Sequence, residues 1–284
     1  MKKLIAWLLA MMLMMGCSFA EMAVPEKAIP LPMDGKIDID LDSDGEAEEV
    51  QLRMEYIDDE TYLRIIIEGT DGAMNIYDTW IMYPETCYAL DMNSDGILEI
   101  LLTGDLQSDD YCTWCLNYDL ENGIRSIKFA DANRGINTGE YLEEGYGKIM
   151  EISGNTITLR GSQDVLGTWM ADRTFSLTNG VFEFADDGLW IMQDITGDED
   201  IWEYYCLTPI KEVPVTFEDG SEGTLAEGEK FVISYTDKTS VAGFTTQNGK
   251  KGSITLTENT EEGWGHKIAG VADYEYFEYI PYAD

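Results

Sequence analysis

Asp40-Leu41-Asp42-Ser43-Asp44-Gly45-Glu46-Ala47-Glu48 and Asp91-Met92-Asn93-Ser94-Asp95-Gly96-Ile97-Leu98-Glu99 are two acidic stretches with one pattern, and they decide the fold. Each has oxygen-bearing side chains at positions 1, 3 and 5, a glycine at 6, an available backbone carbonyl at 7 and a glutamate at 9. Ca²⁺ takes six to eight oxygen ligands at about 2.3–2.6 Å, and alternate residues of a tightly curled loop can supply them. Glycine permits the sharp turn because it adopts positive φ without strain. The repeated pattern predicts two calcium loops.

The predicted metal ligands share this spacing and are Asp40, Asp42, Asp44, Glu46 and Glu48 in the first loop, and Asp91, Asn93, Asp95, Ile97 and Glu99 in the second. The first loop offers four carboxylates, whereas the second offers three and an amide, so we expect the first loop to bind Ca²⁺ more tightly. Neither loop is an EF-hand, because position 12 is Gln51 or Leu102 rather than glutamate. The alternative interpretation is an Asx-rich surface turn without metal.

Each loop leads directly into a strand pattern. After the first loop, apolar and polar residues alternate from Glu49 to Met54, and after the second comes the apolar run Ile100-Leu101-Leu102-Thr103. A Dx[DN]xDGxxE loop that feeds into a strand resembles the calcium loops of FG-GAP/VCBS-type repeats. The resemblance covers the two loops and the hairpins after them. It implies an all-β fold, with β-propeller-like or stacked blade repeats.

The spacing of the loops indicates an internal repeat. The loops begin 51 residues apart, and a damaged third copy begins at Asp194, close to twice that distance after Asp91. This copy lacks the glycine at 6 and the acid at 9, so we expect it to bind no calcium, and Trp202 to Cys206 is predicted to be its outgoing strand. Repeats near this length suggest β units that cover each other's apolar faces.

Most of the remaining chain is predicted to be β-structure. A strand is expected over 62–67, and hairpins are expected over 149–159, turning at Gly154-Asn155, and over 174–184, turning at Asn179-Gly180. No amphipathic helix of three turns is evident. The predicted organisation is a signal peptide over 1–20, a β-repeat domain over 21–208 and a small barrel over 209–284.

The region after Cys206 has a different pattern, with short strands expected over 213–217, 229–235, 241–246 and 252–256. The run from Leu225 to Ile254 resembles a bacterial SH3-like barrel through an L-x-x-G-x-x-h opening and an x-G-x-x-G-x-I close. Such modules imply contact with cell wall or peptide. Val241 and Phe244 stand where an aromatic pair is usual, so a packed structural barrel is the expectation here. The aromatic tail over 274–282 is expected to pack on the core.

The N-terminus has the features of an export signal: Lys2 and Lys3, an apolar run from Leu4 to Met15, and small residues before Glu21. This predicts a secreted protein, or alternatively one that is lipid-anchored through Cys17. Calcium is abundant outside the cell, where even weak sites stay filled. No later segment is long and apolar enough to span a membrane.

The chain carries 55 acidic and 18 basic residues, a formal net charge of −37. Nucleic acid and acidic membranes are therefore not expected as partners, because both need clustered Lys and Arg. The expected partners are calcium and a cell-wall glycan, a peptide or another secreted protein. Bound cations would relieve self-repulsion of the folded chain.

Four cysteines follow the signal: Cys87, Cys112, Cys115 and Cys206. Cys112 and Cys115 lie three apart in a predicted strand, so their side chains should point to opposite faces. Buried free thiols or one structural disulfide are expected, rather than a redox pair or a zinc site.

The sequence contains no GxSxG, HExxH or glycine-rich phosphate loop, and its one histidine, His266, is expected at a surface or barrel edge. We therefore expect a non-catalytic binding or cell-envelope module with structural Ca²⁺. The alternative is a carbohydrate-active enzyme or its accessory glycan-binding subunit, with Trp169, Trp190 and Trp202 as sugar platforms. Apolar neighbours favour a core position for these tryptophans instead.

Overall fold

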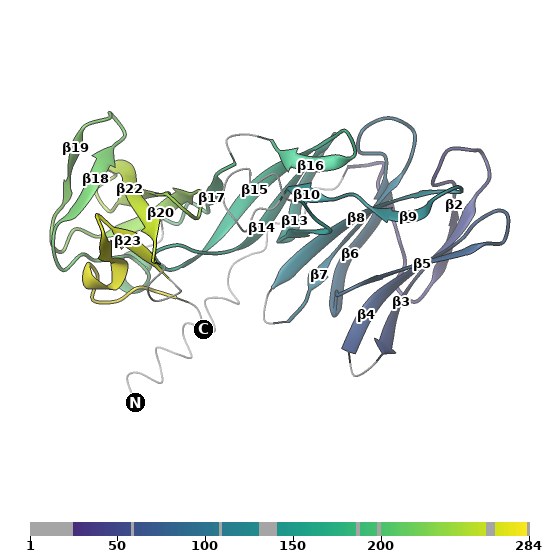
Figure 1. The fold of residues 1–284 in the computed structure, drawn as a ribbon, viewed down its shortest axis with the longest axis horizontal. Helices are drawn as coiled ribbons and strands as arrows, with labels where there is room; N and C mark the ends of the chain where they lie inside the picture. The colour runs from purple at the N-terminus through teal and green to yellow at the C-terminus, as the bar shows by residue number, and fades with distance from the viewer. Residues whose placement is uncertain are drawn as a thin grey trace.

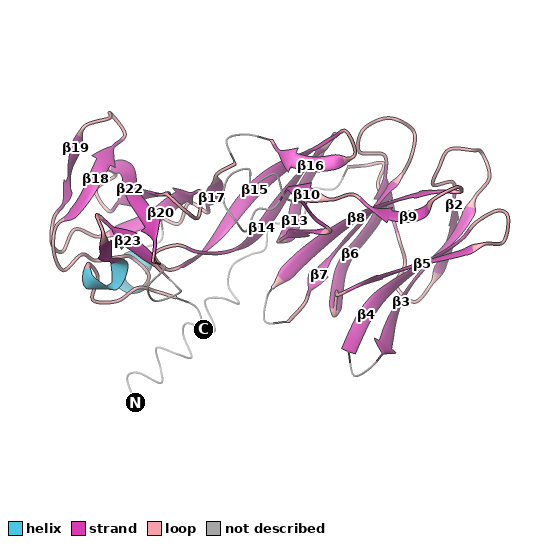
Figure 2. Ribbon diagram, viewed as in Figure 1, coloured by secondary structure: helices cyan, strands magenta, loops and turns pink. Residues whose placement is uncertain are grey.

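The computed structural model describes residues 25–57, 60–107, 110–130, 141–185, 188–197, 200–259 and 265–282. The predicted signal peptide and Cys17 lie outside the described residues. Strands make up almost all of the regular structure, with short helices only near the C-terminal end (Figure 2). The described chain is therefore mostly β, as predicted, and its strands form three open antiparallel or mixed sheets.

The first sheet is an antiparallel meander of four strands, β2 (Lys36–Ile39), β3 (Glu48–Ile57), β4 (Glu60–Glu68) and β5 (Met74–Thr79). The second sheet contains a matching meander, β6 (Tyr83–Leu90), β7 (Glu99–Asp105), β8 (Tyr111–Asp119) and β9 (Gly123–Ser126). We call these meanders unit 1 and unit 2. The edge strands β1 (Ile29–Pro30) and β12 (Glu144–Tyr146) complete the second sheet by pairing with β6 and β8.

The two units stack head to tail, so that equivalent residues face different neighbours. Ile39 and Val50 of unit 1 pack in the core between the two units. Their counterparts 51 positions later, Leu90 and Leu101, pack instead in the core on the far side of unit 2. The same side of each unit thus faces the next unit along the chain.

Unit 1 lies at the end of the stack, and its outer face has polar residues where unit 2 has apolar ones. Unit 2 packs against unit 1 through Ile100 and Leu102, among other side chains. The equivalent positions of unit 1 are Glu49 and Gln51, which are polar. No further unit covers this face in the part of the chain that the structure describes, and a polar outer face is what a terminal repeat needs.

The third sheet is the largest and is built on the long hairpin of β14 (Thr156–Asp164) and β15 (Thr168–Thr178). Nine residue pairs join these strands, and buried side chains alternate along both of them, as expected of a half-buried strand. The other strands up to residue 192 are β10 (Phe129–Ala130), β11 (Tyr141–Leu142), β13 (Lys148–Ser153), β16 (Val181–Phe184) and β17 (Trp190–Met192).

The C-terminal strands continue this sheet: β18 (Val213–Phe217), β19 (Glu222–Leu225), β20 (Phe231–Thr236), β21 (Val241–Thr246), β22 (Lys251–Glu258), β23 (His266–Ile268) and β24 (Val271–Ala272). They lie at the opposite end of the elongated molecule from unit 1 (Figure 1). The two helical segments are α2 (Ile201–Tyr204) and η1 (Asp273–Glu275).

The closed architectures expected from the sequence are not found among the described residues. Only two matching units are present, and the region after them forms long hairpins, so no propeller ring is made. In the expected barrel, the edge of β20 pairs with β17, which extends the sheet instead of closing it. The strands expected over 213–217 and 241–246 are nevertheless confirmed as β18 and β21. The domain boundary after residue 208 stays a prediction.

Both hairpin predictions are confirmed, because their turns are set by local residues. Gly154 has φ 57° between β13 and β14, and Asn179 and Gly180 have φ 53° and 77° between β15 and β16. The strand expected over 202–206 is wrong, since Ile201–Tyr204 is helical. The Trp202 indole donates to the Thr196 carbonyl at 3.0 Å, which holds this short helix against the preceding turn.

The described cysteines are free thiols, and Cys112 and Cys115 lie in different cores, on opposite faces of β8.

His266 is 9% exposed, and its Nε2 lies 3.1 Å from the Lys238 carbonyl oxygen, so the expected surface position is wrong. In the tail, Tyr276 and Phe277 are buried, as expected, whereas Tyr279 is exposed.

Candidate metal centre

Both predicted calcium loops lie in the same place in their units. Residues 40–47 join β2 to β3, and residues 91–98 join β6 to β7. In each loop the glutamate at position 9 is the first residue of the outgoing strand and is buried, with Glu48 1% and Glu99 2% exposed. The outgoing strand therefore carries the last carboxylate of each loop into the protein interior.

Equivalent residues of the two loops make equivalent hydrogen bonds. The backbone amide at position 2 donates to the buried glutamate at 2.9 Å in both loops, from Leu41 to Glu48 and from Met92 to Glu99. The further matching pairs are Gly45 N to Asp40 Oδ2 and Gly96 N to Asp91 Oδ2, both at 3.1 Å, and Glu46 N to Asp44 Oδ1 and Ile97 N to Asp95 Oδ1, both at 2.8 Å. The two loops thus share these hydrogen bonds to the backbone.

Backbone torsions agree with these hydrogen bonds. Gly45 and Gly96 have φ of 92° and 93°, a region that an L side chain rarely adopts. Ser43 and Ser94 both have φ of 61°. The glycine at position 6 is therefore required by the conformation of each loop.

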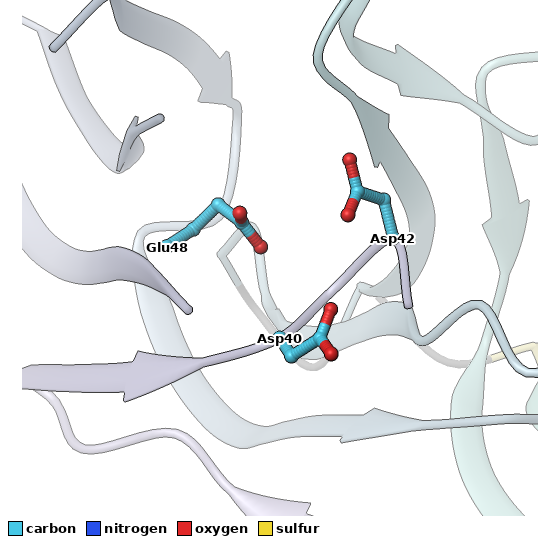
Figure 3. A group of neighbouring side chains, drawn as sticks. All are labelled: Asp40, Asp42 and Glu48. Atoms are coloured by element: carbon cyan, nitrogen blue, oxygen red, sulfur yellow. The ribbon is translucent and has the colours of Figure 1, made fainter. Parts of the chain in front are cut away.

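The first loop brings three carboxylates together. Single oxygen atoms of Asp40, Asp42 and Glu48 all lie within 4.8 Å of one another. Figure 3 shows these side chains turned toward a common space from the loop and from the start of β3. Asp40 Oδ1 is buried and has no hydrogen-bond partner in the described part of the chain. This donor set fits a hard cation, which prefers carboxylate oxygen.

Two other predicted ligands of the first loop, Asp44 and Glu46, are exposed and lie outside this cluster. Asp44 Oδ1 instead accepts the amide of Glu46. In the second loop, the Asn93 amide nitrogen lies 2.9 Å from Asp95 Oδ2 and 3.5 Å from Glu99 Oε1.

The remaining predicted ligands of the second loop, Asp91 and Ile97, take part in its backbone hydrogen bonds, Asp91 as an acceptor and Ile97 as a donor. Asp91 is exposed, whereas Ile97 is partly buried.

The buried glutamates carry unfavourable electrostatics. Burial raises the pKa of Glu99 to about 7, the Met92 amide opposes this effect, and the charges of Asp95 and Asp91 add to it. Burial also raises the pKa of Glu48, against the Leu41 amide and together with the charge of Asp42. A carboxylate in such surroundings is stabilised in its charged form by a nearby cation.

The two loops contact each other directly, and these contacts are not symmetric. Leu98 N donates to the Leu41 carbonyl at 2.8 Å, and the Ser43 hydroxyl donates to the Gly96 carbonyl. The equivalent contacts from Ala47 and Ser94 of the other loop do not occur between these described residues. This asymmetry follows from head-to-tail stacking, in which each loop meets a different side of its neighbour.

Tyr118, on β8 of unit 2, is a neighbour of the first loop that the motif does not predict. It is 1% exposed, and its hydroxyl has no hydrogen-bond partner in the described structure. Burial and then the charges of Glu48 and Asp42 raise its pKa. Tyr118 is distant from the first loop in sequence, so only the stacking of the units could have revealed it.

The damaged copy at Asp194 forms a simple turn, in which Asp194 Oδ1 accepts the Thr196 amide at 3.0 Å and the Thr196 hydroxyl at 2.7 Å. Two of its later residues, 198 and 199, lie outside the described chain.

The tryptophans considered as sugar platforms, Trp169, Trp190 and Trp202, are 6%, 0% and 8% exposed and pack in the core.

Comparison with known proteins found no matching family model, no similar curated protein and no similar solved structure. Within the described ranges, no helix has the length and apolar character needed to cross a membrane.

Proposed function

We propose that this chain is a secreted calcium-binding β-repeat protein of the FG-GAP/VCBS type, in which Ca²⁺ holds the loops of two stacked units. The observation that carries the proposal is the repeated loop geometry: two loops with the same hydrogen bonds each end in a buried glutamate. A metal-free Asx turn needs neither that glutamate nor the convergence of Asp40, Asp42 and Glu48.

The proposed role of the metal is structural, and the proposed activity of the protein is non-catalytic binding at the cell envelope. In both loops the buried glutamate bonds to a backbone amide and begins a strand. These features support a clamp where strands meet. The basis for export is the N-terminal sequence over 1–20, with lipid attachment at Cys17 as the alternative.

Calcium titration by calorimetry tests the proposal. We expect two binding events in the full chain and the loss of one in each of the variants Asp42→Ala and Asp95→Ala. Asp38→Ala is the matched control, since Asp38 is an exposed carboxylate on β2 just before the first loop. Absence of calcium binding to the wild type, or equal binding in all variants, would contradict the proposal.

The same titration ranks the two loops. We expect the first loop to bind more tightly, because it offers four carboxylates and the second offers three and the Asn93 amide. Asn93→Asp should therefore bring the affinity of the second loop closer to that of the first. Unequal affinities that persist unchanged in Asn93→Asp would show that carboxylate number does not set the difference.

A further inference from the structure

The outer face of unit 1 carries an ordered set of aromatic and charged side chains. Strand register places Glu55 opposite Tyr62 and Arg53 opposite Arg64 across β3 and β4. On the next strand, Asp78 lies opposite Arg64, and Trp80 follows the end of β5 beside Tyr62. Within the described ranges, no other sheet lies beyond β3, β4 and β5 at this end of the molecule (Figure 1).

Two aromatic rings, those of Tyr62 and Trp80, form one row of this face, and Tyr62 is the partly buried one. The ring centroids of Tyr62 and Trp80 are 5.1 Å apart with planes tilted by 49°, and Trp80 is 58% exposed. An aromatic face is electron-rich and attracts positively polarised hydrogen atoms. The C–H groups on one side of a pyranose ring are such hydrogen atoms, so an exposed indole face is a suitable surface for a sugar ring.

The neighbouring row consists of Arg53, Arg64 and Asp78, and its side chains form ion pairs with one another and with Glu55. Arg64 Nε and Nη2 donate to the two Asp78 carboxylate oxygens at 2.6 and 2.7 Å. Arg53 Nε lies 2.6 Å from Glu55 Oε1. Each carboxylate oxygen keeps a second lone pair, and the guanidinium groups have further N–H donors. Neighbouring hydroxyl groups of a sugar can accept from and donate to such forks.

The size and charge of this face select among possible ligands. Residues on one face of a strand repeat at roughly 7 Å, so the aromatic and charged rows together span about one or two sugar rings. The charges of Arg53 and Arg64 are balanced by those of Glu55 and Asp78, so the face is locally neutral. The net charge of −37 opposes polyanions and also a second copy of this chain.

We propose that this face, defined by Arg53, Glu55, Tyr62, Arg64, Asp78 and Trp80, binds neutral polysaccharide chains. A sugar ring stacks on Trp80 beside Tyr62, and its hydroxyl groups bond to the Arg64–Asp78 pair. The site is separate from the calcium loops, so it can be tested in calcium-saturated protein whether or not calcium has the proposed role.

Native gel electrophoresis through gels that contain a mixed-linkage β-glucan, a galactomannan or an arabinoxylan tests this proposal. We expect at least one of these neutral polysaccharides to retard the full chain. Trp80→Ala should bind it at least tenfold more weakly, and Asp78→Asn should also weaken binding. Tyr204→Ala is the matched control, because Tyr204 is 56% exposed at a distant helix, and it should be retarded like the wild type.

Circular dichroism and thermal melting will show whether each variant folds, and Tyr62→Phe provides a second variant that keeps the ring. Failure of all three polysaccharides to retard the wild type would overturn the proposal. Equal retardation of folded Trp80→Ala would also overturn it. Retardation only in a parallel gel that contains an anionic polysaccharide would assign this face to a different ligand and would overturn the proposal as well.

Discussion

At the scale of single residues, Asp237 shows how one buried carboxylate holds a turn between two strands. Its side chain is 6% exposed and accepts the amides of Thr239, Ser240 and Val241 at 2.8–2.9 Å. Burial acts to raise the pKa of Asp237, but the hydroxyl of Ser240 and these amides outweigh it and hold the pKa below its usual value. The turn between β20 and β21 therefore favours the charged form of Asp237.

Asp237→Asn should lower the free energy of unfolding at pH 7 by about 1–3 kcal/mol, because it removes the charge and the acceptor of the Ser240 hydroxyl. A depressed pKa in the folded state contributes stability above the unfolded value of 3.8, and this contribution is lost as the pH falls through the folded value. The difference between wild type and variant should thus shrink below pH 3.8. Urea unfolding between pH 7 and 3 measures it, with Asp38→Asn as the control. A constant difference across that range would contradict this account.

At the scale of elements, we expect the contact between the loops to couple the two proposed calcium sites. Leu98 and Ile97 share one peptide group, so the bond from Leu98 N to Leu41 O orients the Ile97 carbonyl, the predicted position-7 ligand. The Ser43 hydroxyl bonds to the Gly96 carbonyl, in the preceding peptide group. The first loop thus supports the backbone of the second on both sides of Ile97.

Ser43→Ala should weaken calcium binding at the second loop by about fivefold, which corresponds to loss of a hydrogen bond worth about 1 kcal/mol. Ser94→Ala should leave the first loop unchanged, because the equivalent contact does not occur between these loops. Calorimetry in an Asp42→Ala background reads the second loop, and an Asp95→Ala background reads the first. Equal effects of the two serine variants would show that the bond from Ser43 to the Gly96 carbonyl does not set calcium affinity at the second loop.

Sequence patterns predicted the elements whose structure is set locally. The turns at Gly154 and Asn179-Gly180 need positive φ, and glycine and asparagine are the residue types that favour such turns. The residue pattern of the acidic loops correctly predicted that each loop leads into a strand. The pairing of β17 with β20 joins Trp190 to Thr236 and Ile191 to Tyr235, which are far apart in the sequence, and no local signal distinguishes it from closure of a barrel.

The candidate sites divide in the same way. The convergence of Asp40, Asp42 and Glu48 follows from spacing within one loop. By contrast, Tyr118 reaches the first loop only through the stacking of unit 2 on unit 1. Tyr62 and Trp80 meet only through the register of β4 and β5. Helix α2 was missed because its anchor, the bond from Trp202 to Thr196, is a side-chain contact that periodicity does not report.

At the scale of the whole molecule, we expect stability to be sensitive to divalent cations, because the chain carries a formal net charge of −37. A ligand that binds only the folded state at a concentration one hundred times its dissociation constant stabilises it by about 2.7 kcal/mol per site. Millimolar CaCl₂ should therefore raise the melting temperature, and a chelator should lower it. Calorimetric scans with CaCl₂, with chelator, and with NaCl at matched ionic strength separate site binding from general screening. Equal melting temperatures in CaCl₂ and NaCl would exclude specific stabilisation.

The polar outer face of unit 1 also bears on how such a chain can lengthen over evolution. A copy of unit 2 inserted between β5 and β6 would find an apolar partner on each side, because unit 2 has Ile100 and Leu102 on one face and Leu90 and Leu101 on the other. A unit added ahead of β2 would instead be laid against Glu49 and Gln51, which offer it no core. Whole units can thus be added between the existing units, but not ahead of unit 1. New repeats should accordingly appear behind the first unit, which keeps its role as the end piece in longer descendants.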